Sequence, residues 1–165
     1  MSNALLVIKG TLEVIVSVEV LERTGVSPEN TDVLLLGTAP TLPIDLRSDI
    51  KNLLQKFGNW RSVSEAILDT DFDLDLATDH LRKRFEGYNP TIILCDSLFD
   101  IGNKALFDTF ATSRIILFDN GISSHTERKV VRGPNSSKAQ YIRYDDVQRV
   151  DAAYFLSQKC RPLNT

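Results

Sequence analysis

Polar residues and glycines follow four of the apolar runs in this sequence. They form the segments Lys9-Gly10-Thr11, Gly37-Thr38, Asp96-Ser97 and Asp119-Asn120-Gly121. Each preceding run has the length and composition of a buried β-strand. Parallel strands have their carboxyl ends at one edge of a sheet, and open α/β sheets bind ligands there. We therefore expect the four segments to converge on one site.

Asp119 is the strongest catalytic candidate among these residues. A carboxylate that leaves a buried strand into a glycine turn is fixed in direction and poorly solvated. Poor solvation raises the pKa of a carboxyl group, which suits a general base. The alternative is structural, because Asp-Asn-Gly is also favourable turn chemistry and Asp119 could simply cap the next segment.

The alternation of apolar runs with helical periodicity indicates the fold class. Strands are predicted at residues 4–8, 33–37, within 60–67, 91–95 and 113–118, and helices at 11–24, 44–57, 76–88 and 101–110. Beyond residue 121 only 141–143 and 152–156 resemble strands. Continuous apolar strands separated by helices are typical of a parallel sheet covered on both faces. The prediction is a doubly wound, mostly parallel, Rossmann-like α/β domain over residues 1–158, with a tail or the start of a linker at 159–165.

The first helix carries two more specific expectations. Thr11 is a plausible N-cap, and Gly25 is the residue at which the helix ends. The apolar positions that fit helical spacing, and so a core face, are Leu12, Ile15, Val16, Val20 and Leu21. The β-branched residues in this stretch keep a strand open as the alternative.

Composition excludes several classes of protein. With 19 basic and 22 acidic residues among 165, the chain has a net charge of −3 and is unsuited to coating nucleic acid. The two cysteines are too few for a disulfide scaffold. No apolar run reaches the roughly 18 residues of a membrane span, and the N-terminus does not resemble a signal peptide. We expect a reduced, cytoplasmic protein.

The usual metal and nucleotide motifs are not matched. The aspartates at 69, 71, 73 and 75 lack the glycine and glutamate that a calcium loop needs at its sixth and twelfth positions. The Lys9-Gly10-Thr11 turn has too few glycines for a phosphate cradle. The histidines and cysteines lack metal-ligand spacing. We predict no metal and no resident cofactor.

Three stretches together resemble a known family. Residues 5–13, with the helix that follows, 90–97 and 113–124 resemble the corresponding strands, turns and helix of bacterial sialyltransferases and capsule polysialyltransferases. The most motif-like is Phe118-Asp119-Asn120-Gly121, which is similar to that family's acidic-acidic-Gly motif at a strand end. Residues 153–156 resemble the short strand that follows.

The resemblance implies one half of a two-domain, GT-B glycosyltransferase. In that architecture the N-terminal domain holds the acceptor glycan and the general base, and the C-terminal domain binds CMP-sialic acid. By resemblance Asp119 would take the proton of an acceptor hydroxyl in an inverting transfer. The acceptor-binding candidates are Lys9, Gly10, Thr11, Asp96, Ser97, Asn120, Gly121, Ser123, Ser124 and His125.

Two departures from the family pattern limit the expectation. The second acid of the motif is Asn120 here, so a base required at that position would be missing. The family's His-Pro motif and a second α/β set are also missing from these residues. We therefore expect an acceptor-side domain that is inactive alone and that meets a CMP-sugar only with a second domain. The alternative is a non-catalytic α/β module that binds a small ligand or a protein partner, for which the basic run at 128–143 is a candidate surface.

Overall fold

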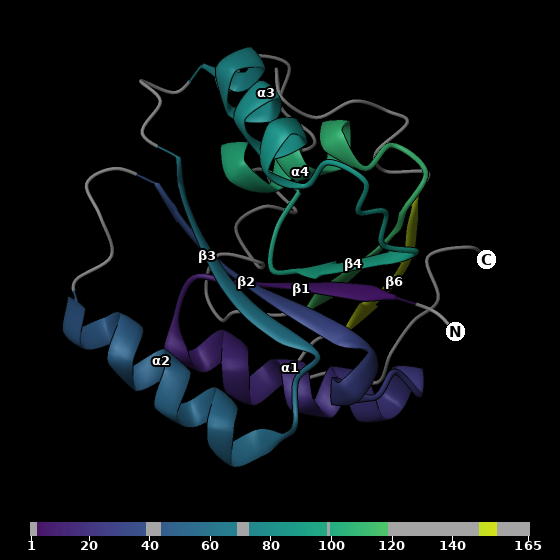
Figure 1. The fold of residues 1–165 in the computed structure, drawn as a ribbon. Coiled ribbons are helices and arrows are strands. Elements are labelled where there is room, and N and C mark those ends of the chain that lie inside the picture. The colour runs from purple at the N-terminus through teal and green to yellow at the C-terminus, as the bar shows by residue number, and fades with distance from the viewer. Residues whose placement is uncertain (1–2, 39–43, 69–72, 99, 119–148, 155–165) are drawn as a thin grey trace, which may run out of the picture.

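The computed structural model describes residues 3–38, 44–68, 73–98, 100–118 and 149–154 (Figure 1). The strands are β1 (Ala4–Ile8), β2 (Thr31–Thr38), β3 (Ser62–Leu68), β4 (Ile92–Cys95), β5 (Arg114–Phe118) and β6 (Val150–Tyr154). The helices are α1 (Thr11–Thr24), α2 (Ile44–Phe57), α3 (Leu74–Arg84) and α4 (Ile101–Thr109), with a 3-10 turn, η1, at Pro28–Asn30. The predicted strand at 4–8 and helices at 11–24 and 44–57 match at both ends, whereas α3 begins and ends earlier than expected.

The strands form one sheet in the order β3-β2-β1-β4-β5-β6, and every pair is parallel. This confirms the doubly wound, Rossmann-like α/β class. The chain runs outward from β1 to β3 and then returns to the other side of β1 to form β4. The junction between β1 and β4 is therefore the switch point of the sheet, where ligands bind in open α/β folds.

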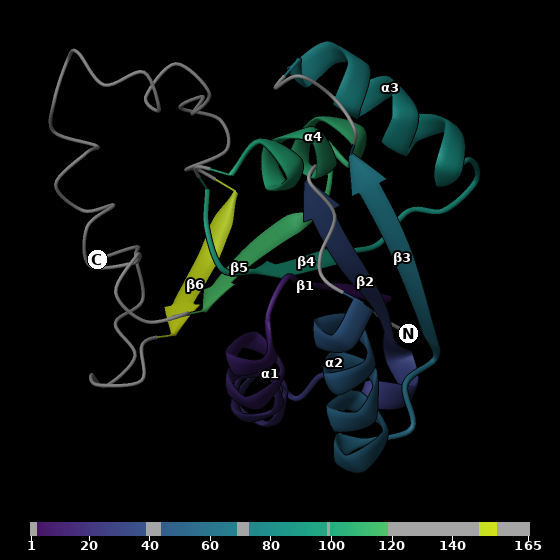
Figure 2. The same cartoon turned by 90° about the vertical axis from the view of Figure 1, so that its left-hand side faces the viewer.

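Helices cover both faces of the sheet, as Figures 1 and 2 show: α1 and α2 lie on one face, and α3 and α4 on the other. Alternate residues of β1 serve the two cores because strand side chains alternate in direction. Leu6 and Ile8 pack in the cluster that includes α1 and α2, and Leu5 and Val7 in the cluster that includes α3 and α4. This explains why the strand reads as an unbroken apolar run.

Helix α1 corrects two expectations from the sequence. Gly10, in an extended conformation, is the N-cap, and Thr11 is the first helical residue. Leu12 and Ile15, expected in the core, are 44% and 52% exposed. The buried side of the helix is formed instead by Glu13, Val14, Val16, Ser17, Val20 and Leu21.

Several predictions fall outside the described residues. These are the strand at 141–143, the basic run at 128–143 and the domain boundary near 158. Strand β6 confirms a last strand in this region and begins two residues before the predicted 152–156, of which 155 and 156 lie outside the described residues. Within the described residues, no helix has both the length and the apolar composition required to cross a membrane.

Candidate functional site

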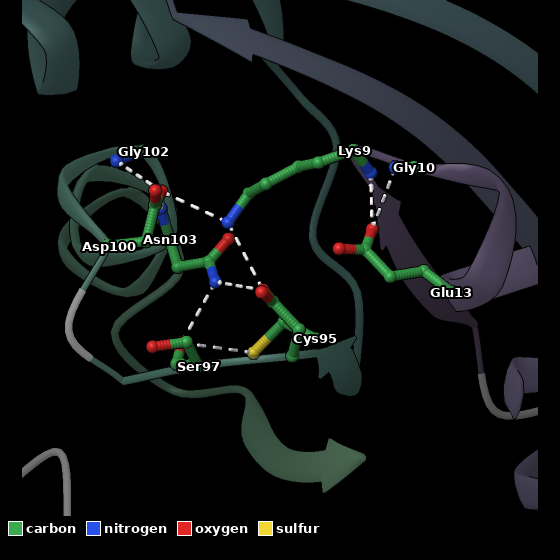
Figure 3. A network of polar contacts seen from close by, with 9 residues as sticks. Lys9, Gly10, Glu13, Cys95, Ser97, Asp100, Gly102 and Asn103 are labelled. Atoms are coloured by element: carbon green, nitrogen blue, oxygen red, sulfur yellow. Dashed lines mark hydrogen bonds and ion pairs between the residues drawn. The ribbon is translucent and has the colours of Figure 1, made fainter. Parts of the chain in front are cut away.

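The carboxyl ends of β1 and β4 bring a group of polar residues together at the switch point. Lys9 follows β1, Asp96 follows β4, Glu13 lies in the first turn of α1, and Asp100 and Asn103 lie at the start of α4. We refer to these five residues as the switch-point cluster (Figure 3). They come from two separate stretches of sequence that only the sheet order makes neighbours.

The Lys9 ammonium lies between two carboxylates. Its Nζ atom is 3.1 Å from Oδ1 of Asp96 and 3.1 Å from Oδ1 of Asp100. The Lys9 side chain is 20% exposed and that of Asp96 only 9%, so these charges are poorly screened by water. Burial opposes the charge on Lys9, but Asp100, Asp96 and Glu13 together outweigh it and raise the lysine pKa. Lys9 is therefore a fixed cation at neutral pH.

Asn103 connects the loop after β4 to helix α4. Its Nδ2 atom donates to Oδ1 of Asp96 at 3.0 Å and to the carbonyl of Ser97 at 2.8 Å. The side chain is fully buried, yet its Oδ1 atom has no hydrogen-bond partner in the described part of the chain. A buried amide oxygen usually has a donor, so this atom calls for a functional explanation.

Asp100 is the N-cap of α4. Its Oδ1 atom accepts from the backbone N–H groups of Gly102 at 2.9 Å and Asn103 at 3.1 Å. Gly102 is required here by close packing, because a Cβ atom at this position would lie 2.7 Å from Cδ2 of Leu36 and 3.3 Å from Cδ1 of Leu68. The start of α4 is therefore held tightly against the ends of β2 and β3, with Asp100 directed toward Lys9.

Glu13 occupies the amino terminus of its own helix. Its Oε2 atom accepts from the backbone N–H of Lys9 and, at 3.2 Å, from that of Gly10. The side chain is only 6% exposed. Burial and then Asp96 raise the pKa of Glu13 to about 7, although the two backbone amides and the Lys9 ammonium favour its ionised form. Glu13 thus titrates near neutrality while it holds the β1–α1 turn.

Cys95 lies beneath the cluster as a free, fully buried cysteine. Its sulfur is 3.7 Å from the carbonyl oxygen of Ser97. Burial and then Asp96 raise the pKa of the thiol. A thiol that stays protonated is a poor nucleophile, so Cys95 is part of the core and not of the chemistry.

The structure unites part of the predicted site. Lys9 and Asp96 form an ion pair, Gly10 donates its N–H to Glu13, and Ser97 is tied to Asn103 through its carbonyl. Thr11 begins α1 and is half-buried. The remaining candidates lie outside the described residues: Asp119, Asn120, Gly121, Ser123, Ser124 and His125.

Sequence reasoning missed Glu13, Asp100 and Asn103. A signal was available for Asp100, because an aspartate just before an apolar helical period is typical of an N-cap. A signal was also available for Glu13, since a glutamate three residues after a helix cap often reaches back to the cap's N–H. Asn103 carried no signal, because its role depends on how α4 packs against the loop after β4.

A separate pocket of about 280 Å³ lies away from the cluster, where α1 and α2 end. It is lined by Val18, Leu21, Glu22, Gly25, Val26, Ser27, Pro28, Phe57 and Trp60. Glu22 is the only ionisable side chain in this lining, so the pocket offers volume and apolar contact but little acid–base chemistry. The described residues contain no group of three or more histidine, cysteine or acidic side chains arranged to hold a metal ion.

Comparison with known proteins adds no family assignment. No model of a known protein family matches the chain, and no curated protein matches it significantly. The chemistry of the switch-point cluster and the sequence around Asp119 are therefore the basis for a functional proposal.

Proposed function

We propose that this chain is the acceptor-binding domain of an inverting glycosyltransferase similar to the bacterial sialyltransferases and capsule polysialyltransferases. Its substrate in this role is a saccharide hydroxyl, and the sugar nucleotide would be bound by a second domain of GT-B architecture. The observation that carries the proposal is the β1–α1 turn, where Glu13 accepts the N–H groups of Lys9 and Gly10.

The β1–α1 turn favours the acceptor-binding domain of such an enzyme over its nucleotide-binding domain. In nucleotide-binding folds of this topology, the N–H groups at the start of the first helix bind a phosphate. Here the chain's own carboxylate takes the N–H groups of Lys9 and Gly10, and Asp96 and Asp100 add negative charge nearby. A nucleotide phosphate would meet an occupied helix terminus and like charge. An uncharged acceptor hydroxyl meets neither obstacle.

The end of β5 supports the role proposed for Asp119. Strand β5 pairs with β4 so that Leu117 is level with Cys95, and Phe118 ends the strand. The next residue in the sequence is Asp119. Parallel pairing brings the end of β5 to the same edge of the sheet as Asp96. In the proposed reaction Asp119 accepts the acceptor's hydroxyl proton as that oxygen bonds to the anomeric carbon, while the bond from this carbon to the CMP oxygen breaks.

The first experiment separates acceptor binding from donor binding. The chain is titrated with oligosaccharide acceptors and with CMP-sialic acid by calorimetry or NMR, and is also incubated with both to detect transfer. We expect it to bind a saccharide, to bind no CMP-sialic acid and to transfer no sugar. Transfer by the isolated chain, or binding of CMP-sialic acid without any saccharide, would contradict the proposal.

An Asp119→Asn variant tests the base directly. A hydrogen bond from the acceptor hydroxyl to a carboxylate contributes about 1.5–3 kcal/mol, so its loss should weaken saccharide binding roughly tenfold or more. The matched control is Asp49→Asn, an exposed aspartate of α2, which should leave the affinity unchanged. Equal saccharide affinity in the two variants would remove Asp119 from the site.

The apolar pocket favours the second candidate function, a non-catalytic module that binds a small ligand. Its volume of about 280 Å³ approaches the lower range of ligand sites, and Trp60 contributes an aromatic wall. A screen of small apolar probes by NMR distinguishes the two functions. Under this alternative, probes would shift the amide signals around Val26 and Trp60, while saccharides would shift none.

A further inference from the structure

We infer that the apolar pocket where α1 and α2 end is a binding site for a small organic cation, a primary amine with an apolar body. Helices α1 and α2 lead from the carboxyl ends of β1 and β2 to the amino ends of β2 and β3. The pocket therefore lies at the edge of the sheet opposite the switch-point cluster. The inference goes beyond the proposed function and does not depend on it.

The end of α1 forms the first wall of the pocket. Gly25 follows the helix with a positive φ of 68°, a conformation that favours glycine. Its N–H donates to the carbonyl of Glu22 at 3.3 Å, and that of Val26 donates to the carbonyl of Leu21 at 3.2 Å. The chain thereby reverses direction at a fixed point, and residues 26–28 line the pocket together with the last turn of the helix.

Trp60 forms the aromatic wall, and its indole is held in place by the chain itself. Its Nε1 atom donates to the carbonyl of Leu54, in the last turn of α2, at 2.7 Å. Pro28 packs closely on Gly58, where a Cβ atom would lie 2.9 Å from Cβ of the proline. The N–H of Arg61 donates to the carbonyl of Pro28 at 3.2 Å. Because these contacts join the two walls without a ligand, the pocket is preformed.

The electrostatics of the pocket favour a positive charge. Glu22 supplies its one ionisable side chain, and this carboxylate forms no ion pair in the described part of the chain. Both α1 and α2 end at the pocket, so the negative ends of two helix dipoles meet there. Arg23 and Lys56 lie in the same last turns, but neither lines the pocket, and Arg23 is paired with Glu19. A cation is therefore attracted and an anion is repelled.

The rest of the lining suits the apolar body of such a ligand. Val18, Leu21 and Val26 supply aliphatic contacts, and Phe57 and Trp60 supply aromatic rings. Phe57 is 40% exposed, so a bound ligand would cover apolar surface that now meets water. An ammonium close to an aromatic ring is attracted by the electrons of that ring, most strongly by those of tryptophan. An ammonium on a short apolar body therefore matches both parts of the pocket.

The test compares three ligands of similar size that differ in charge. At pH 7.5 phenethylamine is a cation, 2-phenylethanol is neutral and phenylacetate is an anion. Trp60 is the only tryptophan of the chain, so the single indole N–H signal in the NMR spectrum reports on this pocket. We expect the amine to bind about fivefold or more tightly than the alcohol and the acid to bind most weakly. The difference between amine and alcohol should shrink as salt is added.

A Glu22→Gln variant makes the test specific to the pocket. The Glu22 side chain is exposed, so the variant should fold normally. Removal of its charge should lower the preference for the amine over the alcohol about threefold or more. The control is Glu86→Gln, at an exposed glutamate in the turn after α3, which should keep the wild-type preference. Both variants change the net charge equally, so a difference between them arises from the pocket and not from the charge of the whole chain.

Three results would overturn the inference. The first is a Trp60 indole signal that none of the three ligands shifts, and the second is equal affinity for the amine and the alcohol. The third is an equal preference for the amine in the Glu22→Gln and Glu86→Gln variants. Amine-induced shifts of the Lys9 and Gly10 amides without a shift of Trp60 would place the cation at the switch-point cluster and also overturn it. None of these titrations contains a saccharide, so their failure is distinct from failure of the proposed function.

Discussion

Lys9 and Asp96, 87 residues apart in the sequence, form an ion pair of 3.1 Å that joins the carboxyl ends of β1 and β4. The ion pair links the two strand ends that flank the switch point of the sheet. The same ammonium holds Asp100 at 3.1 Å, so the starts of the segments after β1 and β4 depend on one side chain. The charged side chains of the candidate site are therefore held in place by ion pairs with each other.

Replacement of Lys9 by methionine should destabilise the fold. The variant leaves Asp96 and Asp100 without their cation, and Asp96 is too shielded for water to compensate fully. We expect the free energy of unfolding to fall by about 1–3 kcal/mol, measured by urea denaturation at pH 7.5. Arg23→Met removes a more exposed ion pair with Glu19 and should cost less than about 0.5 kcal/mol. Equal stability of the two variants would show that the Lys9 contacts contribute little.

The buried Glu13 should make stability depend on pH. Its pKa is raised from 4.5 to about 7 in the folded chain, so between these values the folded state holds a proton that the unfolded state releases. The contribution of Glu13 to stability is therefore fully present below pH 4.5 and is lost as the pH rises through 7. Glu13→Gln removes this dependence, and its stability relative to wild type should rise by about 2–3 kcal/mol from pH 4.5 to pH 8.

Denaturation of both proteins across this pH range measures the effect, and the carboxyl carbon signal of Glu13 reports the pKa itself. The midpoint of that signal should lie near 7. A midpoint close to 4.5, with parallel stability curves for wild type and variant, would contradict the account of the β1–α1 turn.

Substitution of Gly102 by alanine should displace the start of α4. The new Cβ atom would lie 2.7 Å from Leu36 and 3.1 Å from Oδ1 of Asp100, so the helix must shift away from β2. We expect a loss of about 1–3 kcal/mol of stability and a weaker Lys9–Asp100 contact. At Gly10 a Cβ would meet no atom within 4 Å, so Gly10→Ala should cost under about 1 kcal/mol. Calorimetric unfolding compares the two, and a larger loss for Gly10→Ala would refute the packing explanation.

Arg149 should be essential for the attachment of β6. Its Nε donates to the carbonyl of Ser113 at 2.9 Å, Nη1 to that of Phe107 at 3.1 Å and Nη2 to that of Phe110 at 2.6 Å. Lysine has no planar fork with which to span the three acceptors. Arg149→Lys should cost about 2–3 kcal/mol and lower the hydrogen-exchange protection of β6. Arg114→Lys, at an exposed pair with Asp151, should change neither quantity measurably.

Local patterns predicted each helix and strand of the described residues, although the bounds of α3 and β2 differ from the prediction and the 3-10 turn η1 was not predicted. The continuous apolar run of β1 and the amphipathic spacing of α2 depend on neighbouring residues only, and both were predicted with the observed ends. The orientation of α1 was not predicted, because it depends on how the helix packs against α2 and β1. Leu12 and Ile15 therefore lie on the exposed side although their spacing fits a core.

The candidate site was predicted only in part, because local patterns locate strand ends but do not show which residues meet in the folded chain. Strand ends identified Lys9 and Asp96, because parallel strands align their carboxyl ends. That these two residues touch depends on the order of strands in the sheet, which no local pattern specifies. Asn103 was missed because its importance arises only when α4 packs over the loop after β4.

Amide chemical-shift mapping distinguishes a saccharide from a nucleotide at the switch point. Labelled chain is titrated separately with methyl galactoside and with CMP. We expect the sugar to shift the amide signals of Lys9, Gly10 and Asn103, and CMP to leave them unchanged. Shifts of Lys9 and Gly10 with CMP, or sugar-induced shifts confined to Val26 and Trp60, would show that the switch point is not a saccharide site.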